Sequence, residues 1–225
     1  MTKLIRFNNK KIICTGGVVF IGDGQTGKTH TALNLAGINK IEFGESEESP
    51  LKKSVNLEFN YFVLQTEFGN TETIISSQLF IMPGQKGKAS KGNGLAFEDA
   101  TDFFLSAATV KEVLALVLTY DLSDLKTFQK LDYWLERAMN RNLIHDYTSI
   151  ILLGTHLDFR KEIIITEQNI NNAISYINSY LIKNGFNFNA KDIHPIKISN
   201  KTKEGIPLLK EAICISFLSA FNLYS

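Results

Sequence analysis

The strongest constraint on the fold is the octapeptide GDGQTGKT at residues 22–29. It follows an apolar run that ends with Phe20 and Ile21, and it leads into a segment, residues 30–35, that predicts a helix. The spacing G-x-x-x-x-G-K-T between a strand and a helix is typical of a loop that binds the phosphates of a nucleoside triphosphate. The strand and helix on either side disfavour a chance occurrence of the motif.

Each part of this phosphate loop has a physical task. Its glycines let the backbone wrap around the phosphates, so that successive N–H groups and the helix N-terminus point at the anion. Lys28 is expected to reach the β- and γ-phosphates, and the Thr29 hydroxyl is expected to take one Mg²⁺ position. The predicted nucleotide-binding residues of this segment are Gly22, Asp23, Gly24, Gln25, Thr26, Gly27, Lys28, Thr29 and His30.

Composition adds bounds but no function of its own. The chain has 225 residues, of which 44% are hydrophobic, and this suits one globular domain over residues 1–225. A net charge of +1 and a pI near 7.7 give no basic excess for nucleic acid or for an anionic membrane. Cys14 and Cys214 are far apart in the sequence, so we expect reduced core thiols. No stretch predicts a signal peptide, a lipid anchor or a membrane span, so we expect a cytoplasmic protein.

Apolar blocks alternate with amphipathic ones, which predicts an α/β fold with helices on both faces of a sheet. We expect a mostly parallel six-stranded sheet with one antiparallel edge, plus an extra strand hairpin at the N-terminus. The expected strands cover residues 4–7, 12–21, 55–65, 71–82, 113–119, 149–153 and 193–198. The expected helices cover residues 30–35, 127–141, 167–183 and 205–218. A turn at residues 68–70 predicts the antiparallel edge, and residues 44–53 and 84–94 lack periodicity, which predicts mobile loops.

Two strand ends carry residues suited to a purine base. The buried strand at residues 150–154 delivers Thr155, His156, Leu157 and Asp158 to its carboxyl end, where α/β sheets bind ligands. The Asp158 carboxylate can accept two hydrogen bonds from N1 and N2 of guanine, whereas adenine offers no such pair of donors. The next strand ends at Ser199, Asn200 and Lys201.

With these segments, the chain resembles a Ras-superfamily small GTPase over nearly its whole length. Residues 22–29 match the phosphate loop of that family, residues 155–158 its N/T-K-x-D guanine box, and residues 199–201 its S-A-K box. The resemblance implies a Ras-like G domain of the P-loop NTPase class that binds GTP or GDP with Mg²⁺. It also implies that Thr155, His156, Asp158, Ser199, Asn200 and Lys201 surround the base.

The same resemblance locates two nucleotide-sensing switch segments. The sequence SVNLEF at residues 54–59 is similar to T-I-G-V-D/E-F, which implies that Ser54 is a second Mg²⁺ ligand. The sequence LFIMPGQ at residues 79–85 is similar to L-W-D-T-A-G-Q, which implies that Gly84 senses the γ-phosphate and that Gln85 orients the attacking water. Gly24 would then leave room for Gln85. The alternative for Gln85 is a solvated loop residue.

The chain departs from the family pattern at two positions. Ile81 replaces the D-x-x-G aspartate that holds Mg²⁺ through water, and His156 replaces the lysine of the guanine box. The imidazole either stacks on the nucleotide or is a tolerated change. MglA-like polarity GTPases share the N-terminal hairpin and a P-G-Q switch II without the aspartate, and the resemblance to them implies a small roadblock-type (longin-like) partner.

Three functions remain open from the sequence. The favoured one is a slow GTPase switch that needs an activating partner or effector. The second is a guanine-nucleotide-binding module that scarcely hydrolyses GTP, and the third is an ATPase or nucleotide kinase with Asp121 as its metal residue. A turn-capping role for Asp121 at Ser123 is favoured over that metal role.

Trp134 is expected in the core, and His30, His145 and His194 lack the spacing of metal ligands. One of several lysines near the switches could instead offset transition-state charge, namely Lys52, Lys53, Lys86, Lys88 or Lys91.

Overall fold

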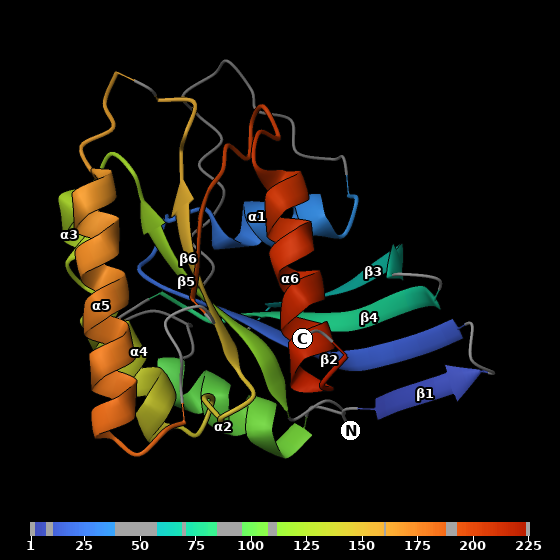
Figure 1. The fold of residues 1–225 in the computed structure, drawn as a ribbon. Coiled ribbons are helices and arrows are strands. Elements are labelled where there is room, and N and C mark those ends of the chain that lie inside the picture. The colour runs from blue at the N-terminus through green and yellow to red at the C-terminus, as the bar shows by residue number, and fades with distance from the viewer. Residues whose placement is uncertain are drawn as a thin grey trace.

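The fold is a single mixed β-sheet with helices on both faces (Figure 1). The computed structural model describes residues 3–7, 11–38, 58–68, 71–84, 96–107, 112–159, 161–187 and 193–223. The strands are β1 (Lys3–Phe7), β2 (Lys11–Ile21), β3 (Glu58–Phe68), β4 (Thr71–Ile81), β5 (Val113–Asp121), β6 (Ser149–Thr155) and β7 (Ile193–Lys197). The helices are α1 (Lys28–Leu35), α2 (Phe97–Ala107), α3 (Leu125–Phe128), α4 (Leu131–Asn140), α5 (Glu167–Lys183) and α6 (Ile206–Ala220).

Strand β2 is the centre of the sheet, whose order is β3-β4-β2-β5-β6-β7. It pairs in parallel with β4 along one side over residues 11–20. Its other side is shared, because β1 pairs antiparallel with residues 11–15 and β5 pairs in parallel with residues 17–21. The sheet is mostly parallel, as expected, and the N-terminal hairpin is present. It has seven strands, because β1 of that hairpin is part of the same sheet as the six expected strands.

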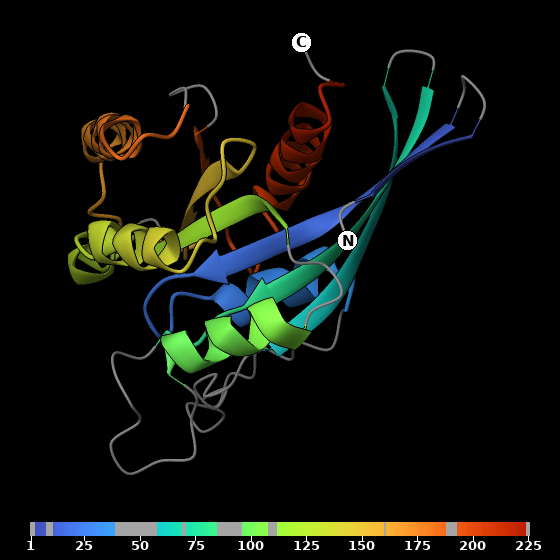
Figure 2. The same ribbon diagram turned by 90° about the horizontal axis from the view of Figure 1, so that it is seen from below.

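Antiparallel pairing occurs at two places rather than at one edge. The expected β3–β4 hairpin is present, but β3 runs on to Phe68, which was predicted to lie in the turn. The second antiparallel pair is β1 with β2. Far from the helices, these four strands project together as an arm of the sheet (Figure 2). Pairing of residues 66–68 with residues 71–73 extends β3 beyond the strand expected at residues 55–65.

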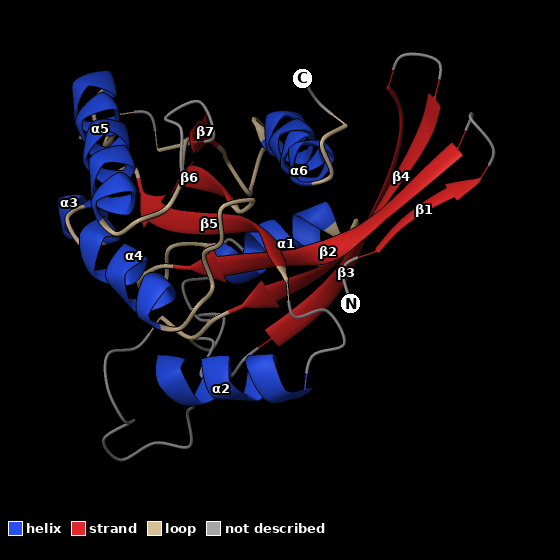
Figure 3. Cartoon of the chain, turned by 60° about the horizontal axis from the view of Figure 1, so that its bottom comes forward, coloured by secondary structure: helices blue, strands red, loops and turns tan. Residues whose placement is uncertain are grey.

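Helices cover both faces of the sheet (Figure 3), and a separate apolar cluster lies on each face. Helices α1 and α6 pack on one face against side chains such as Val18, Phe20 and Ile81. Helices α2, α4 and α5 pack on the other face against side chains such as Val19 and Leu116. The strict alternation along β2 gives each face its own core, as expected for a strand buried on both sides. The α/β class expected from the sequence is confirmed.

One helix prediction needs correction. The single helix expected at residues 127–141 is two helices, α3 and α4, separated at Gln129 and Lys130. Asp124 caps α3 by accepting a hydrogen bond from the Lys126 N–H (2.8 Å), and the Thr127 hydroxyl accepts one from the Asp121 N–H (2.9 Å). These contacts tie α3 to the end of β5, which hydrophobic periodicity cannot reveal.

Helix α2 is a further element that sequence reasoning missed. Its apolar residues Phe97, Ala100 and Phe104 are fully buried and follow the i, i+3, i+7 spacing of an amphipathic helix. This spacing was present in the sequence and would have identified the helix. The loops expected at residues 44–53 and 85–94 lie outside the described residues. No helix in the described ranges is both long and apolar enough to cross a bilayer.

Candidate nucleotide-binding site

The phosphate loop lies at the point where the chain changes direction across the sheet. After β2 the chain continues to β3 and β4 on one side, whereas after β5 it continues to β6 and β7 on the other side. The connections from β2 and β5 therefore separate at the carboxyl ends of these strands, which is where open α/β sheets bind ligands. Residues 22–27 follow β2 directly at this point and lead into α1.

The loop backbone requires glycine at two positions. Gly22 has φ of +141°, and a Cβ atom there would lie 2.2 Å from the Thr119 carbonyl oxygen. Gly27 has φ of +78° and is the N-cap of α1, with no side chain capping the helix. The N-terminal N–H groups of α1 are thus not capped by a side chain and suit an anion. Gln25 also has a positive φ of +68°, a strained conformation typical of ligand-binding loops.

Lys28 is buried beneath this loop. Its side chain is only 5% exposed, and Nζ donates hydrogen bonds to the carbonyl oxygens of Gly22 (2.8 Å) and Asp23 (2.6 Å). Burial lowers the pKa of Lys28 to about 8, although attraction from Asp23 and Glu58 partly opposes the decrease. A buried ammonium group with only carbonyl partners lacks a full counter-charge, and a phosphate would supply it.

Asp23 turns its carboxylate away from Lys28 toward helix α4. One oxygen accepts a hydrogen bond from the indole Nε1 of Trp134 (2.9 Å), and the other forms an ion pair with Lys130. Trp134 is fully buried, as predicted, and packs edge-to-face against Phe97 of α2 with ring centroids 5.5 Å apart. These contacts join the phosphate loop to α2 and α4. The sequence motif gave no indication of Lys130, because the partners are 107 residues apart.

The segment after β4 packs directly against the phosphate loop. The Gly24 N–H donates a hydrogen bond to the Gly84 carbonyl oxygen (3.0 Å). A Cβ atom on Gly84 would lie 2.3 Å from the Gly24 nitrogen and 2.4 Å from the Asp23 carbonyl carbon. Only glycine therefore fits at position 84 in this arrangement. The predicted juxtaposition of the two segments is present, whereas Gln85 and Ser54 lie outside the described residues, as do Lys52, Lys53, Lys86, Lys88 and Lys91.

Two further loops are bonded to the phosphate loop by buried polar side chains. The Thr155 hydroxyl lies within hydrogen-bonding distance of the carbonyl oxygens of Thr26 (3.0 Å) and Tyr120 (3.1 Å). The Asn200 amide donates to the Gly27 carbonyl oxygen (3.3 Å), and its oxygen accepts from the Thr31 hydroxyl (3.1 Å). The loops after β6 and β7 are thus held at the same place as the loop after β2.

The remaining predicted base-binding residues differ in their exposure. Ser199 is fully buried, and its hydroxyl accepts a hydrogen bond from the Thr202 N–H (3.0 Å), so it braces its own loop. Asp158 is half-buried, and Lys201 is exposed. Neither side chain forms a hydrogen bond or ion pair with another residue of the described ranges.

His156 and Asp121 form a pair at the ends of β6 and β5. The Nδ1 atom of His156 lies 2.8 Å from one carboxylate oxygen of Asp121. The other oxygen accepts hydrogen bonds from the backbone N–H (2.8 Å) and the hydroxyl (2.7 Å) of Ser123. The predicted capping of Ser123 is thereby confirmed. Burial alone would raise the pKa of Asp121, but the hydrogen bonds from His156 and Ser123 hold it below its usual value.

Glu58 is a candidate functional residue that sequence reasoning missed. It pairs directly with Ile81 in the β3–β4 ladder, so the two side chains share one face of the sheet. That face is the one covered by α1, because Ile81 is fully buried in the apolar cluster that includes Ala32 and Leu35. Glu58 is half-buried and close enough to Lys28 to attract its charge. Glu58 occupies the D/E position of the resembled switch motif, but only the register of the hairpin places it opposite Ile81.

The predicted metal ligands are only partly described. Thr29 is half-buried at the start of α1. Within the described ranges, no three histidine, cysteine or acidic side chains form a cluster that could hold a metal ion by themselves. Ser54, the other predicted ligand, lies outside the described residues. Magnesium that binds together with nucleotide phosphates typically uses few protein ligands.

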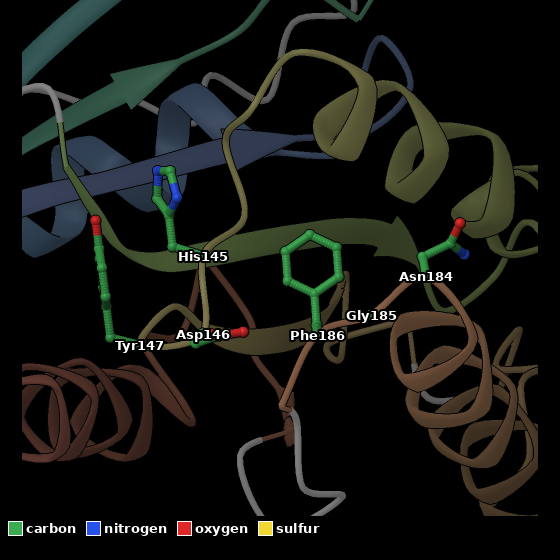
Figure 4. A pocket seen from close by; sticks show the side chains of 6 residues that line it. All are labelled: His145, Asp146, Tyr147, Asn184, Gly185 and Phe186. Atoms are coloured by element: carbon green, nitrogen blue, oxygen red, sulfur yellow. The ribbon is translucent and has the colours of Figure 1, made fainter.

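A separate pocket lies away from the phosphate loop, next to the amino-terminal end of β6 (Figure 4). It is lined by His145, Asp146, Tyr147, Asn184, Gly185 and Phe186. The rings of His145 and Tyr147 stack with centroids 5.1 Å apart, and Asp146 accepts a hydrogen bond from the Asn187 N–H (3.0 Å). These polar groups already pair with the protein and form no constellation with residues 22–29.

Comparisons with known proteins do not identify a family for this chain. No family model matches the chain, and a search of curated proteins gives no match. Function must therefore be argued from the geometry of the phosphate loop and its neighbours.

The buried lysine predicts pH-dependent binding. Because anionic phosphates raise the pKa of Lys28 above about 8, GDP binding above that pH takes up a proton. GDP affinity should therefore fall about tenfold between pH 7 and pH 9. Titration calorimetry in buffers of different ionisation enthalpy measures both the affinity and the proton uptake. Lys28→Met should bind more weakly and lose the proton uptake, and equal uptake in that variant would assign the proton to another group.

Proposed function

We propose that this chain is a guanine-nucleotide-binding switch with a Ras-like G domain, and that it hydrolyses GTP slowly to GDP and phosphate. The observation that carries the proposal is the convergence of four loops at the carboxyl ends of the strands. The phosphate loop forms hydrogen bonds with Gly84, Thr155 and Asn200, which belong to motifs that lie far apart in the sequence. A glycine-rich turn without a ligand-binding role would not be expected to form hydrogen bonds with all three of these segments.

The base is proposed to lie beyond Thr155 and Asn200. The side chains of Thr155 and Asn200 hold the phosphate loop, whereas those of Asp158 and Lys201 are proposed to contact the base. A free carboxylate beside a purine favours guanine, since N1–H and the N2 amino group both donate. Lys201 offers an alkyl stem that can cover one face of the base.

Phosphates and metal are proposed to bind at Lys28 and Thr29. The ammonium group of Lys28 would exchange its carbonyl partners for phosphate oxygens, and the Thr29 hydroxyl would contact Mg²⁺. When bound, Mg²⁺ supplies charge neutralisation at the phosphate oxygens. Ser54 is proposed as a second hydroxyl ligand. Glu58 takes the role of the aspartate that Ile81 replaces, by holding water bound to the metal.

A hydrolysis-deficient binding module is the second candidate function. The fully buried Ile81 favours it, because this side chain offers no oxygen to water or metal. The ATPase or kinase alternative has less support, since both carboxylate oxygens of Asp121 are already engaged by Ser123 and His156. Slow turnover by the isolated chain implies an activator, and a small roadblock-type or longin-type protein is the proposed partner class.

The choice of base tests the guanine assignment. Asp158→Ala should weaken GDP binding by roughly ten- to a hundredfold, the range expected for losing hydrogen bonds to a charged group, and should leave weak ATP binding unchanged. Competition against a fluorescent guanine nucleotide gives both affinities. Glu162→Ala, which removes an exposed carboxylate nearby, is the matched control. Equal competition by ATP and GDP in the wild-type protein would contradict the assignment.

The role of Glu58 predicts metal-dependent nucleotide release. In the wild type, removing Mg²⁺ with EDTA should accelerate GDP release, because the metal links Thr29 to the phosphates. Glu58→Gln should release GDP about tenfold faster in Mg²⁺ and should respond less to EDTA, since one hydrogen bond to a charged group is lost. Glu67→Gln changes an exposed carboxylate on the same strand and should behave as wild type. Identical metal dependence in Glu58→Gln and wild type would exclude the proposed role.

The role of Gln85 separates a switch from a static binder. Gln85→Leu should keep GTP affinity nearly unchanged while slowing hydrolysis at least about tenfold, because the contact to water exists only on the way to the transition state. Single-turnover phosphate release is the measurement, performed with and without a roadblock-type partner. If wild type hydrolyses GTP and the variant keeps the same rate, another group positions the water. If wild type never hydrolyses GTP, the binding-module function is correct.

A further inference from the structure

The turn at residues 156–159, which carries Asp158, is held by a contact between His156 and Asp121 that the motifs do not predict. His156 has a left-handed backbone with φ of +61°, a conformation that histidine adopts more readily than most residues. Its ring has three contacts. Nδ1 lies 2.8 Å from Asp121 on the neighbouring strand and 3.2 Å from the Thr155 hydroxyl, and the ring stacks on Phe159 with centroids 5.5 Å apart and 10° between the planes.

The stacked rings close a short turn that carries Asp158. The Phe159 N–H donates a hydrogen bond to the His156 carbonyl oxygen (3.0 Å). The Leu157 N–H donates to the Ile198 carbonyl oxygen (3.0 Å), which holds the turn against the end of β7. Asp158 is the third residue of this turn. A change in the orientation of His156 therefore moves the carboxylate that is proposed to receive the base.

Asp121 is itself rigidly held. Ser123 binds one carboxylate oxygen twice, and the Leu122 N–H next to Asp121 donates to the Thr155 carbonyl oxygen (3.2 Å). The side chains of His156 and Asp121 are 29% and 18% exposed, so the pair is largely shielded from water. A shielded hydrogen bond to a carboxylate fixes both the tautomer and the orientation of an imidazole.

We propose that Asp121 and His156 are positioning residues that aim Asp158 at the guanine edge, in place of the lysine that the resembled family has at position 156. Neither residue contacts the base in this role. The inference rests on the proposed function, because it takes Asp158 as the receptor for guanine. This role explains why histidine is compatible with position 156, since the contact with Asp121 fixes the orientation of the ring.

The test compares GDP with IDP, whose base lacks the exocyclic amino group but is otherwise the same size. Wild type should favour GDP over IDP by about tenfold or more, because one hydrogen bond to the charged Asp158 is missing with IDP. Asp121→Ala and His156→Ala should each reduce this ratio to about one- to threefold, and the double variant should reduce it no further. The ratio cancels any general loss of affinity. Ser123→Ala removes a hydroxyl from Asp121 without touching His156 and should keep the wild-type ratio.

Two conservative variants and one spectroscopic measurement protect the test against misfolding. Asp121→Asn and His156→Gln preserve side-chain size and should reduce the ratio in the same direction. In ¹⁵N-histidine NMR of the wild type, His156 should show a proton on Nδ1, and this signal should change in Asp121→Asn. A GDP-to-IDP ratio that stays at the wild-type value in all four variants overturns the inference, as does full additivity in the double variant. Equal binding of ATP and GDP by wild type would instead overturn the proposed function.

Discussion

The rest of the site depends on the hydrogen bonds that fix the phosphate loop from two sides. Thr155 reaches the Thr26 carbonyl oxygen, and Asn200 reaches the Gly27 carbonyl oxygen, so the loops after β6 and β7 brace the loop after β2. The carbonyl oxygens of Thr26 and Gly27 are occupied by these bonds. The N–H groups at the start of α1 can therefore face the proposed phosphate site. The same bonds place the proposed base-binding residues at a set distance from the phosphates. One polar network thus links both ends of the proposed nucleotide site.

The charged side chains of Lys28 and Asp23 in this loop have separate partners. Lys28 is buried against carbonyl oxygens, and Asp23 is neutralised by Lys130 and by the Trp134 indole rather than by Lys28. This separation matters, because a direct Asp23–Lys28 ion pair would compete with phosphate for the lysine. Helix α4 therefore keeps the phosphate loop receptive to an anion. The edge-to-face contact between Trp134 and Phe97 extends this support to α2.

The sequence was informative wherever function requires particular backbone chemistry. The glycines of residues 22–27, Gly84 and the ends of β6 and β7 were all predicted, because anion binding at a strand–helix junction leaves few alternatives. Pairings across the chain were not predictable. The Asp23–Lys130 and Asp121–His156 contacts, the break between α3 and α4, and the register that sets Glu58 opposite Ile81 all depend on which strands become neighbours. Helix α2 was different, since its spacing was visible and went unused.

The central claim is that these converging loops hold a guanine nucleotide. The most direct measurement is to denature the purified protein, separate the released small molecules by chromatography and identify any nucleotide against standards. The account predicts GDP, or a mixture of GDP and GTP, in near-stoichiometric amount, and predicts its loss from Asp158→Ala. Release of adenine nucleotides in the same amount, or an empty protein that also fails to take up added GDP, would contradict it.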